Sequence, residues 1–175
     1  MGRSRVYPFR FASNGCIFVG VQATLPLIDP LKGNLLRSSH AVATVFIAVT
    51  LLLAVLQGLI VVATLGVLTI EAKVVIVPGG VLFMVIGNVM GKLRPNHVVG
   101  FRTPWTLANE RVWDQTHRFG GKLFVLGGIL IAALPFTPLD SAGWGVAISA
   151  IALLVAGAPM LKSYLLWRAM QKDAR

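Results

Sequence analysis

The sequence VFIAVTLLLAVL at residues 45–56 lies within thirty consecutive uncharged residues, 41–70. A helix that crosses the hydrocarbon core of a bilayer needs about 20 such residues. This stretch therefore predicts one transmembrane helix, with more uncharged residues at its C-terminal end than a single crossing needs. Three more uncharged stretches of similar character follow at 74–91, 123–139 and 141–161. The sequence thus predicts an all-α integral membrane protein with four transmembrane helices.

The composition of the chain agrees with a bilayer environment. Of the 175 residues, 56% are hydrophobic and 13% are charged, about half of the ~25% that is typical of soluble domains. So few charges could not cover the surface of a water-soluble protein of this size, which argues against a soluble enzyme. The single cysteine, Cys16, excludes an internal disulfide framework and a cysteine-based zinc site.

The positive charges indicate how the helices are oriented. Of the 16 Lys and Arg residues, 15 lie in segments 1–40, 92–122 and 162–175, which four spans place on one side of the bilayer, and only Lys73 lies on the other. Because cytoplasmic segments are enriched in Lys and Arg, we expect both termini to be cytoplasmic. The cations would face the anionic lipids of the inner leaflet. No nucleic-acid-binding motif accompanies them, so direct binding to nucleic acid is not expected.

The remainder of the chain divides around the four spans. Residues 1–40 form a basic N-terminal segment, 41–165 the membrane domain and 166–175 a cytoplasmic tail. Residues 11–28 are uncharged but contain several polar side chains. Two interpretations stay open for 11–28: an interfacial segment, or the end of a helix whose beginning precedes this chain.

The connection 92–122 is unusually long for a helix bundle. It has thirty-one residues, whereas such connections usually have 2–8. In its second half Thr106 is a plausible N-cap, and Gly120 and Gly121 would end the helix before the third span. The pattern predicts an amphipathic interfacial helix in the plane of the headgroups.

This predicted helix carries two kinds of side chain. Trp105 and Trp113 would anchor it at the membrane interface. Glu110, Asp114 and His117 share a polar face, and carboxylates beside a histidine can perform acid–base or metal chemistry. We favour a solvated face without a catalytic residue, cofactor or metal, because no nucleophile or metal-binding motif lies nearby. A membrane enzyme that uses these three residues is the alternative.

Other polar residues also admit two interpretations. Arg102 lies between aromatic residues and could be structural, by capping the loop or by pairing with Glu110 or Asp114, or could bind a lipid phosphate; we favour the structural pairing. Gly87 and Gly91 form a small-residue face on which Asn88 can donate a hydrogen bond, so helix packing is favoured over a substrate pathway. A small transporter subunit is a further alternative, although the four spans contain no charge.

Specific motifs lie in and around the long connection. They are IGN at 86–88, PNH at 95–97, GFRTPWTL at 100–107, ERVW at 110–113 and HRFGGK at 117–122. Together they resemble the SdpI family of bacterial membrane proteins, typified by an immunity protein against a secreted killing-factor toxin. The resemblance extends over about residues 28–165.

The resemblance implies a multi-pass protein of the bacterial cell membrane that confers toxin resistance. In the type system it also implies signalling, in which the immunity protein holds a transcriptional repressor at the membrane. The partners implied are thus a peptide or protein toxin and a cytoplasmic repressor. The type protein has an extra helical hairpin, of which this chain carries at most the end, in 11–28. The motif residues that would form a docking loop are Asn96, Gly100, Arg102, Thr103, Pro104, Trp105, Thr106, Glu110, Trp113, Arg118, Phe119 and Gly120.

Overall fold

The regular secondary structure of the protein is helical throughout the part that the computed structural model describes, residues 24, 31–67, 69 and 71–173. Four helices are long and apolar enough to cross a membrane, so the predicted fold class is confirmed. The 11–28 segment, apart from Thr24, lies outside the described residues. The helices are α2 (Lys32–Arg37), α3 (Ser39–Thr64), α4 (Lys73–Met90), α5 (Pro104–Ala108), α6 (Glu110–Ala133), the 3-10 helix η1 (Leu134–Phe136) and α7 (Ser141–Asp173).

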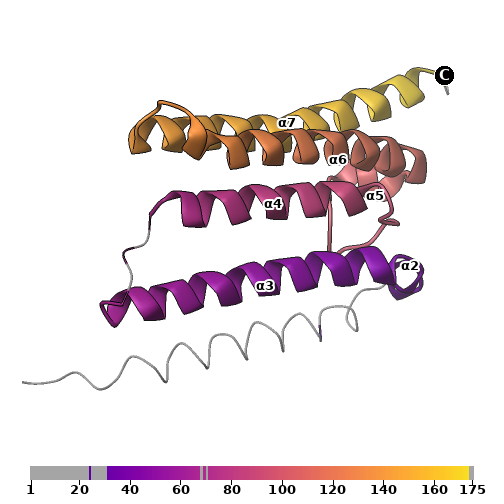
Figure 1. Ribbon diagram of the computed structural model, residues 1–175. Coiled ribbons are helices and arrows are strands. Elements are labelled where there is room, and N and C mark those ends of the chain that lie inside the picture. The colour runs from indigo at the N-terminus through magenta and orange to yellow at the C-terminus, as the bar shows by residue number, and fades with distance from the viewer. Residues whose placement is uncertain (1–23, 25–30, 68, 70, 174–175) are drawn as a thin grey trace, which may run out of the picture.

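The four long helices lie side by side and alternate in direction (Figure 1). Helix α3 packs on α4, α4 on α6, and α6 on α7. As a result, the start of α3, the end of α4, the start of α6 and the end of α7 come together at one end of the molecule, with α2 and α5. We call this end the motif end, because the 91–109 loop, which includes the short helix α5, lies there.

Glycine pairs bring α4 and α6 into backbone contact. A Cβ atom on Gly87 would lie 2.6 Å from the carbonyl oxygen of Gly121, and one on Gly80 would lie 2.6 Å from that of Gly128. In a bilayer, where lipid is as apolar as the helix surface, small residues promote association by allowing such close contact. The α4–α6 pair is therefore the framework that positions the motif end.

The core of buried side chains is concentrated at the motif end. It joins residues of α2, α3, α4, the 91–109 loop and α6, namely Leu35, Ala41, Val42, Val45, Val89, Met90, Leu93, Phe101 and Trp113. Elsewhere aliphatic side chains point outward, such as Ile47 and Leu51 on α3. Such exposed apolar faces suit contact with lipid chains.

Two predicted helix boundaries are wrong. The helix that was expected to end at Gly120 and Gly121 continues through them as α6 to Ala133. A glycine that ends a helix usually adopts a positive φ. Among the described glycines only Gly66 and Gly100 do so, and the pair in α6 gives space to neighbouring elements. The amphipathic stretch is thus the first part of the third long helix.

The predicted N-cap, Thr106, is also wrong. Thr103 caps α5, and Asn109 caps α6 by accepting hydrogen bonds from the backbone N–H groups of Arg111 and Val112. Pro104 accounts for the shift, because proline suits the first helical position and the cap must precede it.

The fourth long helix extends beyond its predicted apolar stretch. Residues 162–173 continue α7 without a break, so the boundary drawn at 165 falls inside a helix. Hydropathy marks the part that can lie in lipid and carries no signal for the end of the helix.

Candidate functional site

The 91–109 loop is folded around the side chain of Asn96. This side chain is fully buried. Its Oδ1 accepts hydrogen bonds from the backbone N–H groups of Val98 and Val99 at 2.8 and 2.7 Å, and its Nδ2 donates to the carbonyl oxygen of Arg94 at 2.7 Å. A buried amide without partners would cost stability, whereas this one closes a turn. Asn96 is therefore a structural residue of the loop.

His117 of α6 fixes the next part of the loop. The backbone N–H of Phe101 donates to its Nε2 at 2.9 Å, and its Nδ1 lies 2.9 Å from the carbonyl oxygen of Trp113. Since an amide nitrogen can only donate, Nε2 is the acceptor and the proton of the neutral ring lies on Nδ1. Both nitrogens are engaged, so neither is available to a substrate or a metal.

The prediction that His117 lies on a solvated face is wrong. Its side chain is fully buried, and its ring stacks on that of Trp113 at 4.0 Å between centroids. The 91–109 loop covers this face of α6, which a helical projection of α6 alone cannot reveal. Gly100 makes the close approach possible: its φ is +118°, and a side chain there would run into the His117 ring.

Trp113 ties α6 to the 91–109 loop, just after the end of α4. Its ring is fully buried, and its Nε1 donates to the carbonyl oxygen of Leu93 at 2.8 Å. The expected role of an interfacial anchor is therefore wrong for Trp113. Its indole N–H finds a partner inside the protein, as buried tryptophans usually require.

Trp105 ties α5 to α7. Its Nε1 donates to Oγ of Ser163, and its ring centroid lies 5.5 Å from that of Tyr164. Oγ1 of Thr103 lies 3.5 Å from the same Ser163 hydroxyl. Ser163, which the sequence analysis did not single out, is thus the α7 partner of the loop.

Thr103 and Thr106 form a reciprocal cap at the start of α5. The Thr103 side chain accepts from the N–H of Thr106, and the Thr106 side chain accepts from the N–H of Thr103. Thr106 is fully buried and its hydroxyl also lies 2.8 Å from the carbonyl oxygen of Phe101. With Pro104 at the first helical position, the RTPW motif encodes a tightly capped short helix.

The charged residues of the motif lie outside this buried network. The Arg102 guanidinium is exposed and donates to the carbonyl oxygen of His97. The expected pairing of Arg102 with Glu110 or Asp114 is wrong: among the described residues Arg102 pairs with neither, and Arg94 pairs with Glu110 at 3.2 Å. Both members of that pair are exposed.

The three residues considered for catalysis are therefore separated by their environments. Glu110 is exposed, Asp114 is half-buried and His117 is fully buried. Within the described ranges, no three His, Cys, Asp or Glu side chains are grouped so that they could hold a metal ion. His97 is exposed on the loop. The geometry offers a rigid surface and no convergent acid–base site among these residues.

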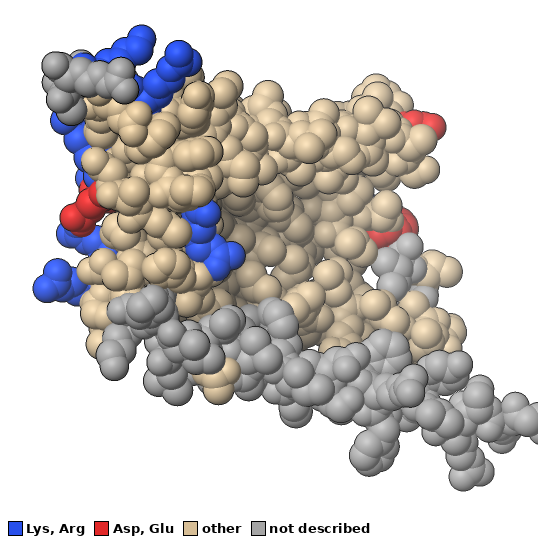
Figure 2. Space-filling model, turned by 180° about the vertical axis from the view of Figure 1, so that it is seen from behind, with Lys and Arg blue, Asp and Glu red and all other residues tan. Residues whose placement is uncertain are grey.

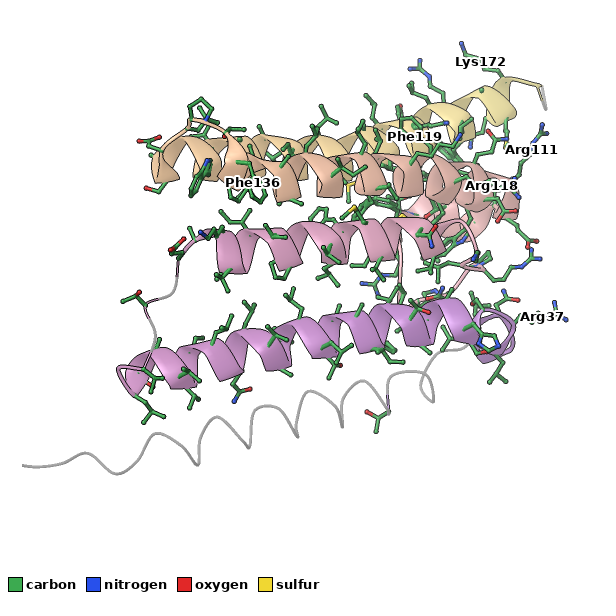
Figure 3. All side chains as sticks on the ribbon, in the orientation of Figure 1. Arg37, Arg111, Arg118, Phe119, Phe136 and Lys172 are labelled. Atoms are coloured by element: carbon green, nitrogen blue, oxygen red, sulfur yellow. The ribbon has the colours of Figure 1, made fainter. Side chains whose placement is uncertain are left out.

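The HRFGGK motif connects α6 to both of its neighbours. Lys162 of α7 lies over the ring of Phe119, with Nζ 4.1 Å from its centroid. A Cβ on Gly120 would lie 2.6 Å from the Phe101 ring. Arg118 is exposed beside Gly91 of α4, on the part of α6 near the motif end (Figure 3).

The small-residue face of α4 is not uniform. Gly87 is in tight contact with α6, whereas a Cβ on Gly91 would meet only Arg118, at 3.5 Å. Asn88 between them is exposed. Gly87 is required for close packing, and Gly91 is not.

Charge is segregated along the molecule. Figure 2 shows Lys and Arg gathered at one end, with acidic atoms among them, and only acidic charged side chains at the opposite end of the visible face. Among the described residues, the basic side chains of this end come from α2, the 91–109 loop, the start of α6 and the end of α7. At the opposite end, Nζ of Lys73 lies 2.5 Å from Oε2 of Glu71.

These features define a multi-pass helical membrane protein whose motif loop is fixed against α4, α6 and α7 at a basic end. Residues 92–163 match the family model of the SdpI/YfhL protein family, so the resemblance seen in the motifs is confirmed. The matched segment begins just after α4 and ends at Ser163, the residue that holds Trp105.

Two proteins of Bacillus subtilis (strain 168) are similar to this chain. The immunity protein SdpI is 44% identical over 57 residues, which are 33% of this chain and 28% of that protein. The uncharacterized protein YfhL is 33% identical over 63 residues, 34% of this chain and 56% of that protein. The similarity thus covers 28% of the length of SdpI and 56% of the length of YfhL. No solved structure shows significant similarity to the chain.

Proposed function

We propose that the protein acts by binding, as an SdpI-type immunity or signalling protein of the bacterial cell membrane, and that it carries out no bond-making chemistry. The observation that carries this proposal is the role of the motif residues at the motif end. Asn96, Trp105, Thr106, Trp113 and His117 engage their polar groups within the fold. Motif residues that hold one another rigidly suit the presentation of a surface to a partner.

The surface offered to a partner consists of exposed charged and polar side chains of the 91–109 loop and the first turn of α6. We call it the docking face and assign to it Arg94, His97, Arg102, Glu110 and Arg111. We further propose that this face is cytoplasmic, which the excess of Lys and Arg on its side of the bilayer supports. A cytoplasmic regulator, such as a repressor held at the membrane, would bind there.

The alternatives receive less support from the geometry. A catalytic role for Glu110, Asp114 and His117 would require a free nitrogen on the histidine, and both are hydrogen-bonded. A transporter would require a polar pathway between the helices. The groove of about 430 Å³ between α3 and α4 has aliphatic lining, including Leu52, Val77 and Leu82.

The proposal is tested in cells that are sensitive to the secreted killing-factor toxin of the type system. Survival would be measured together with membrane recruitment of a fluorescently tagged small helix-turn-helix repressor. We expect the wild-type chain to give survival, recruitment or both, and Asp114→Asn, which lies outside the docking face, to retain the effect. Absence of both effects in a correctly inserted wild-type protein would overturn the binding role. Loss of the effect in Asp114→Asn, when this variant is normally inserted and folded, would instead support catalysis.

A further inference from the structure

A groove between α4 and α6 at the motif end has no role in the proposed function. Its volume is about 560 Å³. Helix α4 contributes Gly87 and Asn88, its C-cap residue Gly91 follows, and α6 contributes Arg118, Gly121 and Lys122. The groove floor is bare backbone, because Gly87 and Gly121 bring the two helices into contact there.

The groove carries two positive charges that the described part of the chain does not neutralise. Arg118 and Lys122 are exposed and lie one helical turn apart on α6. Neither forms an ion pair with a described residue: Glu110 pairs with Arg94, and Glu71 and Asp140 lie at the opposite end. Asp114, one turn before Arg118, is not within ion-pair distance of it. Like charges at this spacing repel, so a bound anion would stabilise them.

Space for the ligand is left at Gly91. This residue ends α4 with a φ of −68°, which any amino acid can adopt. A Cβ there would meet only Arg118, with Cγ at 3.5 Å and Cα at 3.8 Å, which are ordinary contact distances. Neither backbone strain nor helix contact therefore requires glycine at this position, and its effect is to keep the groove open beside the two cations.

The position of the groove along the helices identifies the ligand class. Lys122 is the last charged residue before the uncharged stretch 123–139, so the groove lies where α6 leaves the headgroup region for the hydrocarbon. Val125 lines its far side. Basic pockets between transmembrane helices at this level suit phospholipid headgroups. Arg and Lys favour phosphate oxygens, and the Asn88 amide can bond a headgroup hydroxyl.

We propose that this groove is a specific site for the phosphate headgroup of an anionic phospholipid, held by Arg118, Lys122 and Asn88. The lipid chains would leave the groove past Val125, along the apolar surfaces of α4 and α6. This inference concerns lipid binding at the α4–α6 seam and is independent of the docking face.

The test measures thermal stabilisation of the purified full chain in neutral detergent, with added phosphatidylglycerol or phosphatidylcholine. We expect phosphatidylglycerol to raise the unfolding temperature more than phosphatidylcholine does. In Arg118→Gln/Lys122→Gln the apparent affinity for phosphatidylglycerol should fall on the order of tenfold. Gly91→Leu, which changes no charge but fills the groove, should weaken binding as well.

A matched control separates a site from general surface charge. Arg168→Gln/Lys172→Gln removes two exposed charges from α7 outside the groove and should leave the phosphatidylglycerol effect unchanged. Equal loss in both double variants, or no loss in Gly91→Leu, would overturn the proposal. Stabilisation by free glycerol phosphate equal to that by the lipid would also overturn it, because the site would then take a soluble phosphate. If the groove double variant does not fold, the two separate variants Lys122→Gln and Gly91→Leu replace it. Each should weaken the stabilisation by phosphatidylglycerol, and no loss in either would overturn the proposal.

Discussion

At the scale of single residues, the motif end depends on polar side chains that are buried and paired. Asn96, Thr106 and His117 have no solvent exposure. A hydrogen bond inside the protein is stronger than one in water, and an unpaired buried group is correspondingly costly. The stability of the loop is therefore expected to be sensitive to the loss of any one of these partners.

The first prediction concerns His117. His117→Ala leaves the backbone N–H of Phe101 buried without its acceptor and removes the ring stacked on Trp113. The loss of the acceptor alone should cost about 1–3 kcal/mol. Chemical unfolding in detergent measures the effect. Glu110→Gln is the control, because its exposed pair with Arg94 contributes little; equal destabilisation by the two variants would contradict the structural role of the histidine.

The second prediction separates two glycines of α4. Gly87→Ala forces a Cβ to within 2.6 Å of the Gly121 carbonyl oxygen, whereas at Gly91 the nearest neighbour is an Arg118 side-chain atom at 3.5 Å. Overpacking of this kind costs about 1–3 kcal/mol. Thermal unfolding in phosphatidylcholine–detergent mixtures should therefore show a lower transition for Gly87→Ala and an almost unchanged one for Gly91→Ala. The reverse order would mean that α4 and α6 are not in close contact at Gly87.

At the scale of elements, α6 shows what sequence patterns can and cannot provide. The third apolar stretch and the amphipathic stretch before it were both predicted as helical. Their fusion into one helix was missed, because Gly120 and Gly121 resemble a stop signal in sequence but meet Phe101 and Gly87 in the structure. The inward orientation of His117 was missed for a related reason. It depends on which face of α6 the preceding loop covers, and the periodicity of α6 does not contain that information.

The third prediction concerns the connection between α5 and α7. Trp105→Phe removes the indole N–H and Ser163→Ala removes its acceptor. If the two groups act as a pair, the double variant should be less destabilised than the sum of the single variants, by about 1 kcal/mol. A double-mutant cycle of unfolding free energies measures this coupling. Trp167→Phe with Ser163→Ala is the parallel cycle, since Trp167 lies near Trp105 but its indole N–H is not paired with Ser163. Additive effects in the Trp105 cycle would show that α5 is not held by this hydrogen bond.

At the scale of the whole molecule, the four helices and their common basic end could be predicted because both are properties of contiguous sequence. Uninterrupted apolar runs such as 45–56 identify the spans, and Lys and Arg are excluded from those runs. The network at the motif end could not be predicted in the same way. Trp105 and Ser163 are 58 residues apart, and Asn34 reaches the carbonyl oxygen of Pro95 across 61 residues. Such partners become visible only when the helices are assembled.

The central claim is that the protein crosses the membrane four times and presents its basic motif end to the cytoplasm. The most direct test places single cysteines at Arg111 and Ser141 in a Cys16→Ser background. Both residues are exposed; Arg111 lies at the start of α6 and Ser141 at the start of α7, and these helix starts are at opposite ends of the molecule. An impermeant thiol reagent is then applied to intact cells and to permeabilised cells. The account predicts that Ser141→Cys is labelled in intact cells, and that Arg111→Cys is labelled only after permeabilisation. Labelling of Arg111→Cys in intact cells would contradict it.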